Sequence, residues 1–271
     1  MDHSLTSILT AFSLTLFAGL ATSVGSAIAF FSRRTNPVML CVSLGFSAGV
    51  MIYVSFVEIF QKANESLLVS FSEKYAAIIT AAAFFAGIGL TALIDALVPS
   101  EENPHEAQGL EDLAASIDLN RTSLLRMGLF SALAIGIHNF PEGFATFTAS
   151  LQDPSLGLAI AIAIAIHNIP EGIAVSVPVY YATGSRKKAF WLSTFSGFSE
   201  PLGAIIGYVI LRQFMNETVF GITFAMVAGI MIYISLDELL PTAEKYGKHH
   251  FAIGGLISGM GVMAGSLLLF M

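Results

Sequence analysis

Two nearly identical six-residue stretches place metal-binding side chains in apolar surroundings. They are His138-Asn139-Phe140-Pro141-Glu142-Gly143 and His167-Asn168-Ile169-Pro170-Glu171-Gly172. In each stretch His and Glu are four residues apart, so an α-helix presents them on one face with the Asn nearby. Imidazole, carboxylate and amide groups are ligands of first-row divalent metals. Because ionisable groups inside long apolar runs are costly and usually functional, the two stretches predict a metal site within a membrane.

A proline in each stretch predicts a local break in the helix. Pro141 and Pro170 have no amide hydrogen, so the carbonyl groups of Ile137 and Ile166 lose their usual helical donor. A carbonyl freed at membrane depth is tolerated only where protein, water or an ion satisfies it. The alternative is that these polar side chains only hydrogen-bond across a helix bundle. The presence of two copies favours the metal site.

A third acid, Glu200, lies within a further apolar run and is followed by Pro201. Pro201 removes the helical donor to the Gly197 carbonyl. A single glutamate at that depth needs a partner. We expect this partner to be the metal cluster; a structural hydrogen bond to a neighbouring helix is the alternative.

The composition is that of an integral membrane protein. The chain has 271 residues, of which 55% are hydrophobic and 11% are charged, whereas soluble domains carry about 25% charged residues. We therefore expect residues 1–271 to form a single polytopic membrane domain with a cytoplasmic loop at about 99–121. The one cysteine, Cys41, excludes an internal disulfide, and no basic stripe predicts nucleic-acid binding.

Eight runs of about 20 apolar residues are long enough to cross the ~30 Å hydrocarbon core as helices. We expect them at residues 5–31, 38–60, 75–98, 122–150, 157–181, 188–211, 218–242 and 250–271. The predicted fold class is therefore an all-α integral membrane protein with eight transmembrane helices.

The distribution of Lys and Arg predicts the orientation of these helices. One side of the membrane carries nine of them: Arg33, Arg34, Arg121, Arg126, Arg186, Lys187, Lys188, Lys245 and Lys248. The other side carries three: Lys62, Lys74 and Arg212. Because basic residues favour the cytoplasmic side, we expect both termini on the outer, periplasmic side.

The first three spans resemble the last three. Residues 49–58 (GVMIYVSFVE) match residues 229–238 (GIMIYISLDE), and neighbouring glycines fall at matching positions. Because two spans lie between the triplets, the second triplet crosses the membrane in the opposite direction, which gives a 3+2+3 inverted repeat. Such repeats around a midplane site are typical of transporters; shared packing ancestry without transport is the alternative. Thr22 matches Glu200, so only one half has an acid there.

Four further acids are predicted near the ends of the spans, where a metal would enter and leave. Glu58 lies near the outer end, and Asp95, Asp237 and Glu238 lie near the inner end. Ordinary solvated acids at the membrane interface are the alternative. The acidic loop at 99–121 is interpreted as a linker.

In these motifs the chain resembles the ZIP family of divalent metal transporters over nearly its whole length, and most closely its bacterial branch. The resemblance rests on the eight spans, the paired His-Asn-x-Pro-Glu-Gly stretches and the Glu-Pro pair at 200–201. It implies a binuclear site at the membrane centre, bridged by Glu142 and Glu171. One metal position would use Glu142, His167 and Glu171, with His138 at its edge. The second would use Asn139, Glu142, Asn168, Glu171 and Glu200.

The resemblance also implies import of Zn²⁺ into the cytosol across the inner membrane, assembly as a homodimer and an elevator-like shift of part of the bundle. The oxygen-rich second position admits harder cations, so we expect Fe²⁺ and Mn²⁺ as further substrates. The metals are transported substrates, and no cofactor is expected. The expected partners are divalent metal ions and the lipid bilayer. Some relatives have an acid at the position of Asn168, so their selectivity does not carry over.

Three other functions use the same residue types. An intramembrane metalloenzyme needs an open metal position and a general base, and the chain has no His-Glu-x-x-His sequence. We therefore expect no enzymatic activity. A proton-coupled carrier of an organic substrate would not respond to chelators. A metal exporter would share the ligands, and the metal content of overexpressing cells separates it from an importer.

Overall fold

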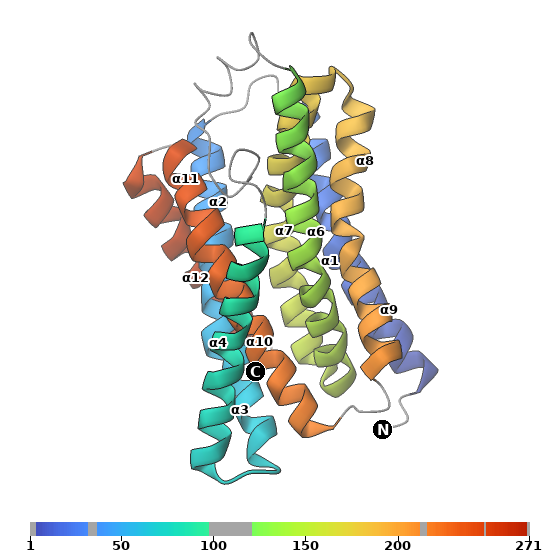
Figure 1. Ribbon diagram of the computed structural model, residues 1–271, viewed down its shortest axis with the longest axis vertical. Helices are drawn as coiled ribbons and strands as arrows, with labels where there is room; N and C mark the ends of the chain where they lie inside the picture. The colour runs from blue at the N-terminus through green and yellow to red at the C-terminus, as the bar shows by residue number, and fades with distance from the viewer. Residues whose placement is uncertain (1–3, 32–36, 98–120, 212–215, 247, 270–271) are drawn as a thin grey trace.

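The computed structural model describes residues 4–31, 37–97, 121–211, 216–246 and 248–269. Within these ranges the ordered elements are all helical and there is no β-strand. The long helices run roughly along the long axis of the molecule and connect at its two ends (Figure 1). This confirms the all-α class. The acidic loop at 99–121 lies almost entirely outside the described residues.

The helices fall where the apolar runs were predicted. In chain order they are α1 (Leu5–Phe31), α2 (Pro37–Val54), α3 (Phe60–Leu68), α4 (Glu73–Leu97), α6 (Arg121–Gln152), α7 (Pro154–Thr183), α8 (Arg186–Gly197), α9 (Ser199–Leu211), α10 (Glu217–Ile234), α11 (Leu240–Tyr246) and α12 (His249–Leu269).

Among the described residues, 6 helical segments are long and apolar enough to cross a membrane. They are Leu5–Ile28, Cys41–Leu68, Glu73–Ala96, Pro154–Val177, Glu217–Glu244 and His249–Leu268. The remaining long helix, α6, carries arginines as well as motif residues, and α8 and α9 are short helices of 12 and 13 residues. Large apolar side chains such as Phe85 (67% exposed) and Val209 (62%) face outward, as expected for a surface in contact with lipid.

The predicted helix break lies at one proline of the three. Helix α6 continues through Pro141, and α7 continues through Pro170. The predicted breaks at these two positions are therefore wrong: each helix tolerates one lost hydrogen bond because neighbouring helices pack around it. The chain does break at Phe198, between α8 and α9, three residues before Pro201.

Two π-helices interrupt the matched spans at equivalent places, which was not predicted. The first, η1 (Ser55–Ile59), joins α2 to α3, and the second, η3 (Ser235–Leu239), joins α10 to α11. Each carries one predicted pathway acid at its fourth position, Glu58 or Glu238. Single π-helical turns within α-helices occur frequently at functional sites.

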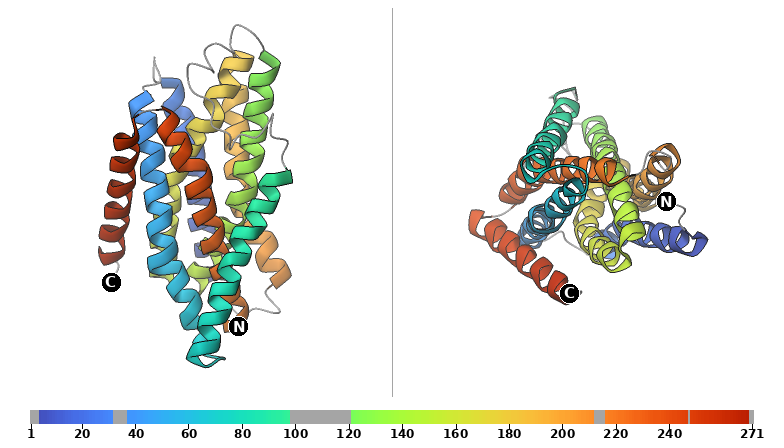
Figure 2. Two further views of the ribbon diagram at one scale, coloured as in Figure 1. Left: turned by 60° about the vertical axis from the view of Figure 1, so that its left-hand side comes forward. Right: turned by 90° about the horizontal axis from the view of Figure 1, so that it is seen from below.

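The helices form two groups that pack mainly within themselves. The first group contains α1, α6, α7, α8 and α9, and the second contains α2, α3, α4, α10, α11 and α12. Contacts of α2 with α7 and of α10 with α6 join the two groups, whose arrangement can be followed from the side and from below in Figure 2. The metal-motif helices α6 and α7 therefore lie in one group and the acids of η1 and η3 in the other.

Matching glycines set the closest approaches within the second group. A β-carbon on Gly49 of α2 would collide with the carbonyl oxygen of Leu256 on α12. A β-carbon on Gly229 of α10 would collide in the same way with the carbonyl oxygen of Phe84 on α4. Helices α2 and α12 therefore cross as α10 and α4 do.

Helix α7 has well-defined caps at both ends. The Asp153 carboxylate accepts hydrogen bonds from the Ser155 hydroxyl (2.7 Å) and from the Ser155 and Leu156 amides (2.9 and 3.4 Å). These hydrogen bonds, led by that of the hydroxyl, lower the pKa of Asp153. Gly184 ends the helix with a φ of 65°, a left-handed conformation that favours glycine.

Candidate metal site

Six of the predicted metal ligands lie deep inside the bundle. Each is at most 1% exposed: Asn139 and Glu142 on α6, His167, Asn168 and Glu171 on α7, and Glu200 on α9. The seventh predicted ligand, His138, has a side chain outside the described ones. Three helices of the first group therefore supply the cluster.

His167 connects the two motif helices. Its Nε2 atom lies 3.1 Å from Glu142 Oε2 on α6 and 3.9 Å from Glu171 Oε1 on its own helix. The spacing of four residues predicted that His167 and Glu171 share a face, but not that Glu142 of the other stretch lies nearest. The two stretches thus meet at the His167 ring.

Asn168 connects the cluster to α9 and α1. Its Nδ2 atom donates a hydrogen bond to Glu200 Oε1 and another, of 2.9 Å, to the carbonyl oxygen of Ala18. Because both partners accept, the amide nitrogen faces them and Oδ1 faces the opposite way. The role of Ala18 was not predicted, since a backbone carbonyl leaves no mark in the sequence.

Four oxygen atoms of the cluster are buried and have no hydrogen-bond donor among the described residues. They are Asn139 Oδ1, Glu142 Oε1, Asn168 Oδ1 and Glu200 Oε2. Amide and ionised carboxylate oxygens only accept hydrogen bonds, and leaving such an acceptor buried without a donor costs about 1–3 kcal/mol. A divalent cation satisfies several such oxygens at once, so the donor set fits a metal with oxygen and nitrogen ligands.

The side chains are hydrogen-bonded to one another rather than gathered around one point. Among the described residues, no three His, Cys, Asp or Glu side chains form a metal-holding group. The separation of 3.1 Å between His167 Nε2 and Glu142 Oε2 is nevertheless close to the ~3.3 Å between two ligands of tetrahedral zinc with bonds of ~2.0 Å. A metal would therefore replace this hydrogen bond with little movement of either side chain.

Glycines allow α9 and α1 to approach the motif helices closely. A β-carbon on Gly143 would collide with the carbonyl oxygen of Glu200, and one on Gly172 with that of Thr22. The reverse contacts repeat the pattern in the pairs Gly203–Phe140 and Gly25–Ile169. The crossing of α9 on α6 therefore matches that of α1 on α7, with Glu200 in one and Thr22 in the other.

The second helix group reaches the cluster through α2. The Ser47 hydroxyl donates a hydrogen bond of 3.5 Å to the carbonyl oxygen of His167. Ser47 is fully buried. This contact places Ser47 of α2 beside the backbone of His167 on α7. Sequence analysis did not identify it.

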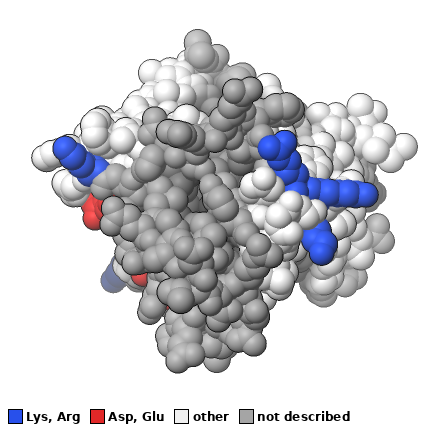
Figure 3. All heavy atoms as spheres, turned by 90° about the horizontal axis from the view of Figure 1, so that it is seen from above, with Lys and Arg blue, Asp and Glu red and all other residues white. Residues whose placement is uncertain are grey.

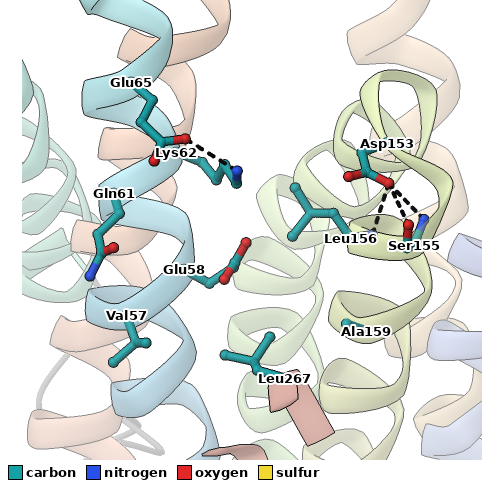
Figure 4. Close-up of a pocket in the computed structure, with 10 residues that line it drawn as sticks. All are labelled: Val57, Glu58, Gln61, Lys62, Glu65, Asp153, Ser155, Leu156, Ala159 and Leu267. Atoms are coloured by element: carbon teal, nitrogen blue, oxygen red, sulfur yellow. Dashed lines mark hydrogen bonds and ion pairs between the residues drawn. The ribbon is translucent and has the colours of Figure 1, made fainter. Parts of the chain in front are cut away.

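Glu58 lines a pocket of about 330 Å³ at the end of the bundle where α7 begins (Figure 4). Its lining residues are Val57, Glu58, Gln61, Lys62, Glu65, Asp153, Ser155, Leu156, Ala159 and Leu267. Three charged neighbours, Lys62, Glu65 and Asp153, were not identified from the sequence. The spacing of Glu58, Lys62 and Glu65 places them on one helix face, but nothing local indicates that Asp153 lies opposite.

The other predicted pathway acids lie toward the opposite end of the bundle. Asp95, near the end of α4, accepts a hydrogen bond of 3.4 Å from the Tyr233 hydroxyl of α10. On η3, Asp237 is exposed and Glu238 is partly buried. Glu58 and this group of acids therefore lie on either side of the buried cluster along the bundle.

The fold and the cluster define a helical membrane protein built around buried His, Asn and Glu side chains, and comparison with known proteins gives its family. Residues 98–268 match the family model of the ZIP zinc transporters. The chain is 64% identical over 265 residues to the zinc transporter ZupT of Chlorobaculum parvum, covering 98% of this chain and 99% of the relative. It is 58% identical over 279 residues to the zinc transporter ZupT of Clostridium perfringens, covering 98% of both. The chain belongs to the ZIP family.

Proposed function

We propose that this protein transports Zn²⁺ through the buried cluster. The observation that carries the proposal is the set of four buried oxygen atoms that have no hydrogen-bond donor among the described residues, in the same cluster as His167 inside an apolar bundle. The names of its relatives, zinc transporters with 58–64% identity, support zinc as the substrate. Zinc is then the cargo rather than a resident cofactor, and the protein is not an enzyme.

The cluster holds two metal ions in this proposal. Glu142 and Glu171 bridge them, His167 binds the first, and Glu200 with the two asparagines binds the second. The contacts of His167 with both glutamates support the bridging role. The second position has only oxygen ligands, so Fe²⁺ and Mn²⁺ are expected as additional substrates.

The membrane arrangement consists of eight spans in a 3+2+3 inverted repeat, with α8 and α9 together forming one span. Three kinds of observation support the repeat: the matching crossings of α9–α6 and α1–α7, those of α2–α12 and α10–α4, and the equivalent π-helices. The two helix groups correspond to the moving and fixed parts of an elevator-like transporter. The chain then assembles as a homodimer, as the family resemblance implies.

The protein is oriented in the bacterial inner membrane with both termini outside. Figure 3 views the end of the bundle opposite the pocket, where Lys and Arg side chains gather near the start of α8. Arg186, Lys187 and Lys188 are exposed there. Basic residues favour the cytoplasmic side, so the pocket with Glu58 faces outward and the acids Asp95, Asp237 and Glu238 face the cytosol.

Metal enters through the Glu58 pocket along the seam between α2 and α7. Glu58 is eleven positions from Ser47, so the pocket lies about 16 Å from the level of His167 at ~1.5 Å per residue. Between these levels, Met51 and Val54 of α2 and Ile160 and Ile164 of α7 are buried in one apolar cluster. The seam must open there for a metal to pass, which a relative shift of the two helix groups provides.

Metal binding also moves a proton. The hydrogen bond between His167 Nε2 and Glu142 Oε2 contains a proton, and a metal can bind Nε2 only after this proton leaves. Protons therefore compete with zinc, and uptake is expected to weaken as the pH falls.

The test is uptake of ⁶⁵Zn²⁺ into proteoliposomes by the parent, Glu171→Ala and Glu200→Ala, with unlabelled Fe²⁺ and Mn²⁺ as competitors. We expect uptake by the parent, none by Glu171→Ala and a changed competition profile for Glu200→Ala. Glu73→Ala, which changes an exposed acid at the start of α4, is the matched control. A parent protein that binds zinc without moving it would contradict the proposal, and export from zinc-loaded cells would reverse its direction.

A further inference from the structure

The pocket at the start of α7 contains a lysine among three acids. Lys62 and Glu65 of α3 and Glu58 of η1 line one side, and Asp153 lies opposite, before the first turn of α7 (Figure 4). With one lysine and three acids, the pocket has a formal charge of −2. A positive side chain in a pocket that admits cations opposes the attraction that the acids provide.

Lys62 is held toward the acids by an ion pair. Its Nζ atom lies 3.1 Å from Glu65 Oε2, and it also interacts electrostatically with Glu58 and Asp153. The two paired side chains are 42% and 60% exposed, and such surface pairs contribute about 0–1 kcal/mol to folding. The ion pair therefore contributes little to stability, whereas the charge of Lys62 directly weakens the negative electrostatic potential of the pocket.

The pocket lies at the outer end of the seam that leads to the metal cluster. Glu58 of η1 and Leu156 of α7 line it, whereas Ser47 of α2, the helix that continues into η1, meets His167 farther along α7. Ser47 and Glu58 are eleven positions apart, and so are Leu156 and His167. Charge in the pocket therefore acts on a cation before it reaches the apolar part of the seam.

We infer that Lys62 sets the strength with which the outer pocket attracts divalent cations. Its ammonium group weakens the negative electrostatic potential of Glu58, Glu65 and Asp153, and its ion pair keeps Glu65 from binding an arriving metal. The pocket therefore attracts cations without binding them tightly. The inference rests on the proposed transport function. It makes Lys62 a determinant of apparent affinity rather than a ligand.

A charge series tests the inference by KM for ⁶⁵Zn²⁺ uptake in proteoliposomes. Lys62→Gln makes the formal charge of the pocket more negative by one, Glu65→Gln makes it less negative by one, and the double variant restores the parent value. We expect KM to fall about threefold in Lys62→Gln and to rise about threefold in Glu65→Gln at low ionic strength. The double variant should have nearly the parent KM, and kcat should change little throughout.

Two controls separate the field of the pocket from other effects. Lys74→Gln removes an exposed lysine from the start of α4, at the same end of the bundle but outside the pocket, and should leave KM unchanged. Lys62→Arg keeps the charge and should keep the parent KM. In about 0.5 M salt, where charges are screened within ~4 Å, the differences should disappear.

The inference is overturned if Lys62→Gln has the same KM as Lys74→Gln, or if Lys62→Gln and Glu65→Gln shift KM in the same direction. The second result would indicate that the ion pair matters for structure rather than for charge. If the parent takes up no zinc, the proposed function fails, and this inference with it. If the parent takes up zinc but the charge variants all have the parent KM, this inference is overturned and the proposed function stands.

Discussion

The crossing of α9 on α6 and the crossing of α1 on α7 share their backbone contacts but differ in chemistry. In the first, Gly143 lies against the carbonyl of Glu200, and in the second, Gly172 lies against the carbonyl of Thr22. The Glu200 carboxylate accepts a hydrogen bond from Asn168, whereas the buried Thr22 hydroxyl has no hydrogen-bond partner among the described residues. Glycine contacts thus position both crossings, and a single side chain gives only one of them a carboxyl group.

The largest expected effect comes from the glycines, and it should be equal in the two crossings. Gly143→Ala and Gly172→Ala each place a β-carbon against a backbone carbonyl that cannot turn away. We expect each to destabilise the protein by about 1–3 kcal/mol, measured by thermal unfolding in detergent. Gly89→Ala is the control, because a β-carbon there meets no atom within 4 Å. If only one of the two substitutions destabilised the protein, the two crossings would not be equivalent.

The second prediction addresses the chemical difference between the crossings. Glu200→Gln removes the carboxyl group that is proposed to bind metal but keeps the shape of the side chain, so we expect zinc uptake to fall at least about tenfold, which corresponds to ~1.4 kcal/mol. Thr22→Ala removes a hydroxyl of the other crossing and should leave uptake within about twofold. Initial ⁶⁵Zn²⁺ uptake rates decide between them. Equal losses in both variants would mean that the crossings contribute alike to the site.

A third prediction concerns pH and depends on the motif helices that the crossings hold together. Because a proton lies between His167 and Glu142, zinc must displace it, and uptake should weaken as the pH is lowered. We expect initial uptake at limiting zinc to fall about threefold or more from pH 7.5 to pH 5.5. Identical rates across this interval would contradict the competition between proton and metal.

The smallest expected effect on stability lies at the start of α7, away from both crossings. Asp153→Ala removes the helix cap and should cost about 1 kcal/mol of stability, whereas Asp153→Asn keeps a capping side chain. Hydrogen bonding lowers the pKa of Asp153 in the folded protein. Its contribution is therefore present above the unfolded pKa of about 3.9 and is lost as the pH falls through the lower folded value. Thermal unfolding at pH 7 and at pH 3 should show a smaller parent-to-Asp153→Ala difference at the lower pH.

Sequence periodicity was sufficient to predict the helices and the residue types of the cluster. The four-residue spacing of His167 and Glu171 placed both on one face, and the apolar surroundings indicated burial. The repeat also related Thr22 to Glu200, the positions that now distinguish the two crossings. These features are local or periodic, so the sequence contains them directly.

Features that depend on tertiary packing were not predictable. Residues 55–59 contain no glycine or proline that would indicate a π-helix. The continuation of α6 through Pro141 depends on the helices around it. The hydrogen bond from Asn168 to the Ala18 carbonyl and the position of Asp153 opposite Lys62 join residues far apart in the chain.

The most direct test of the buried cluster is the number of zinc ions that the purified protein binds, measured by equilibrium dialysis and elemental analysis. The parent should bind two per chain, Glu200→Gln one, and Glu142→Gln none, because Glu142 bridges both positions in the proposed site. Thr22→Ala should keep both ions. Two zinc ions retained by Glu142→Gln, or none bound by the parent, would contradict the account.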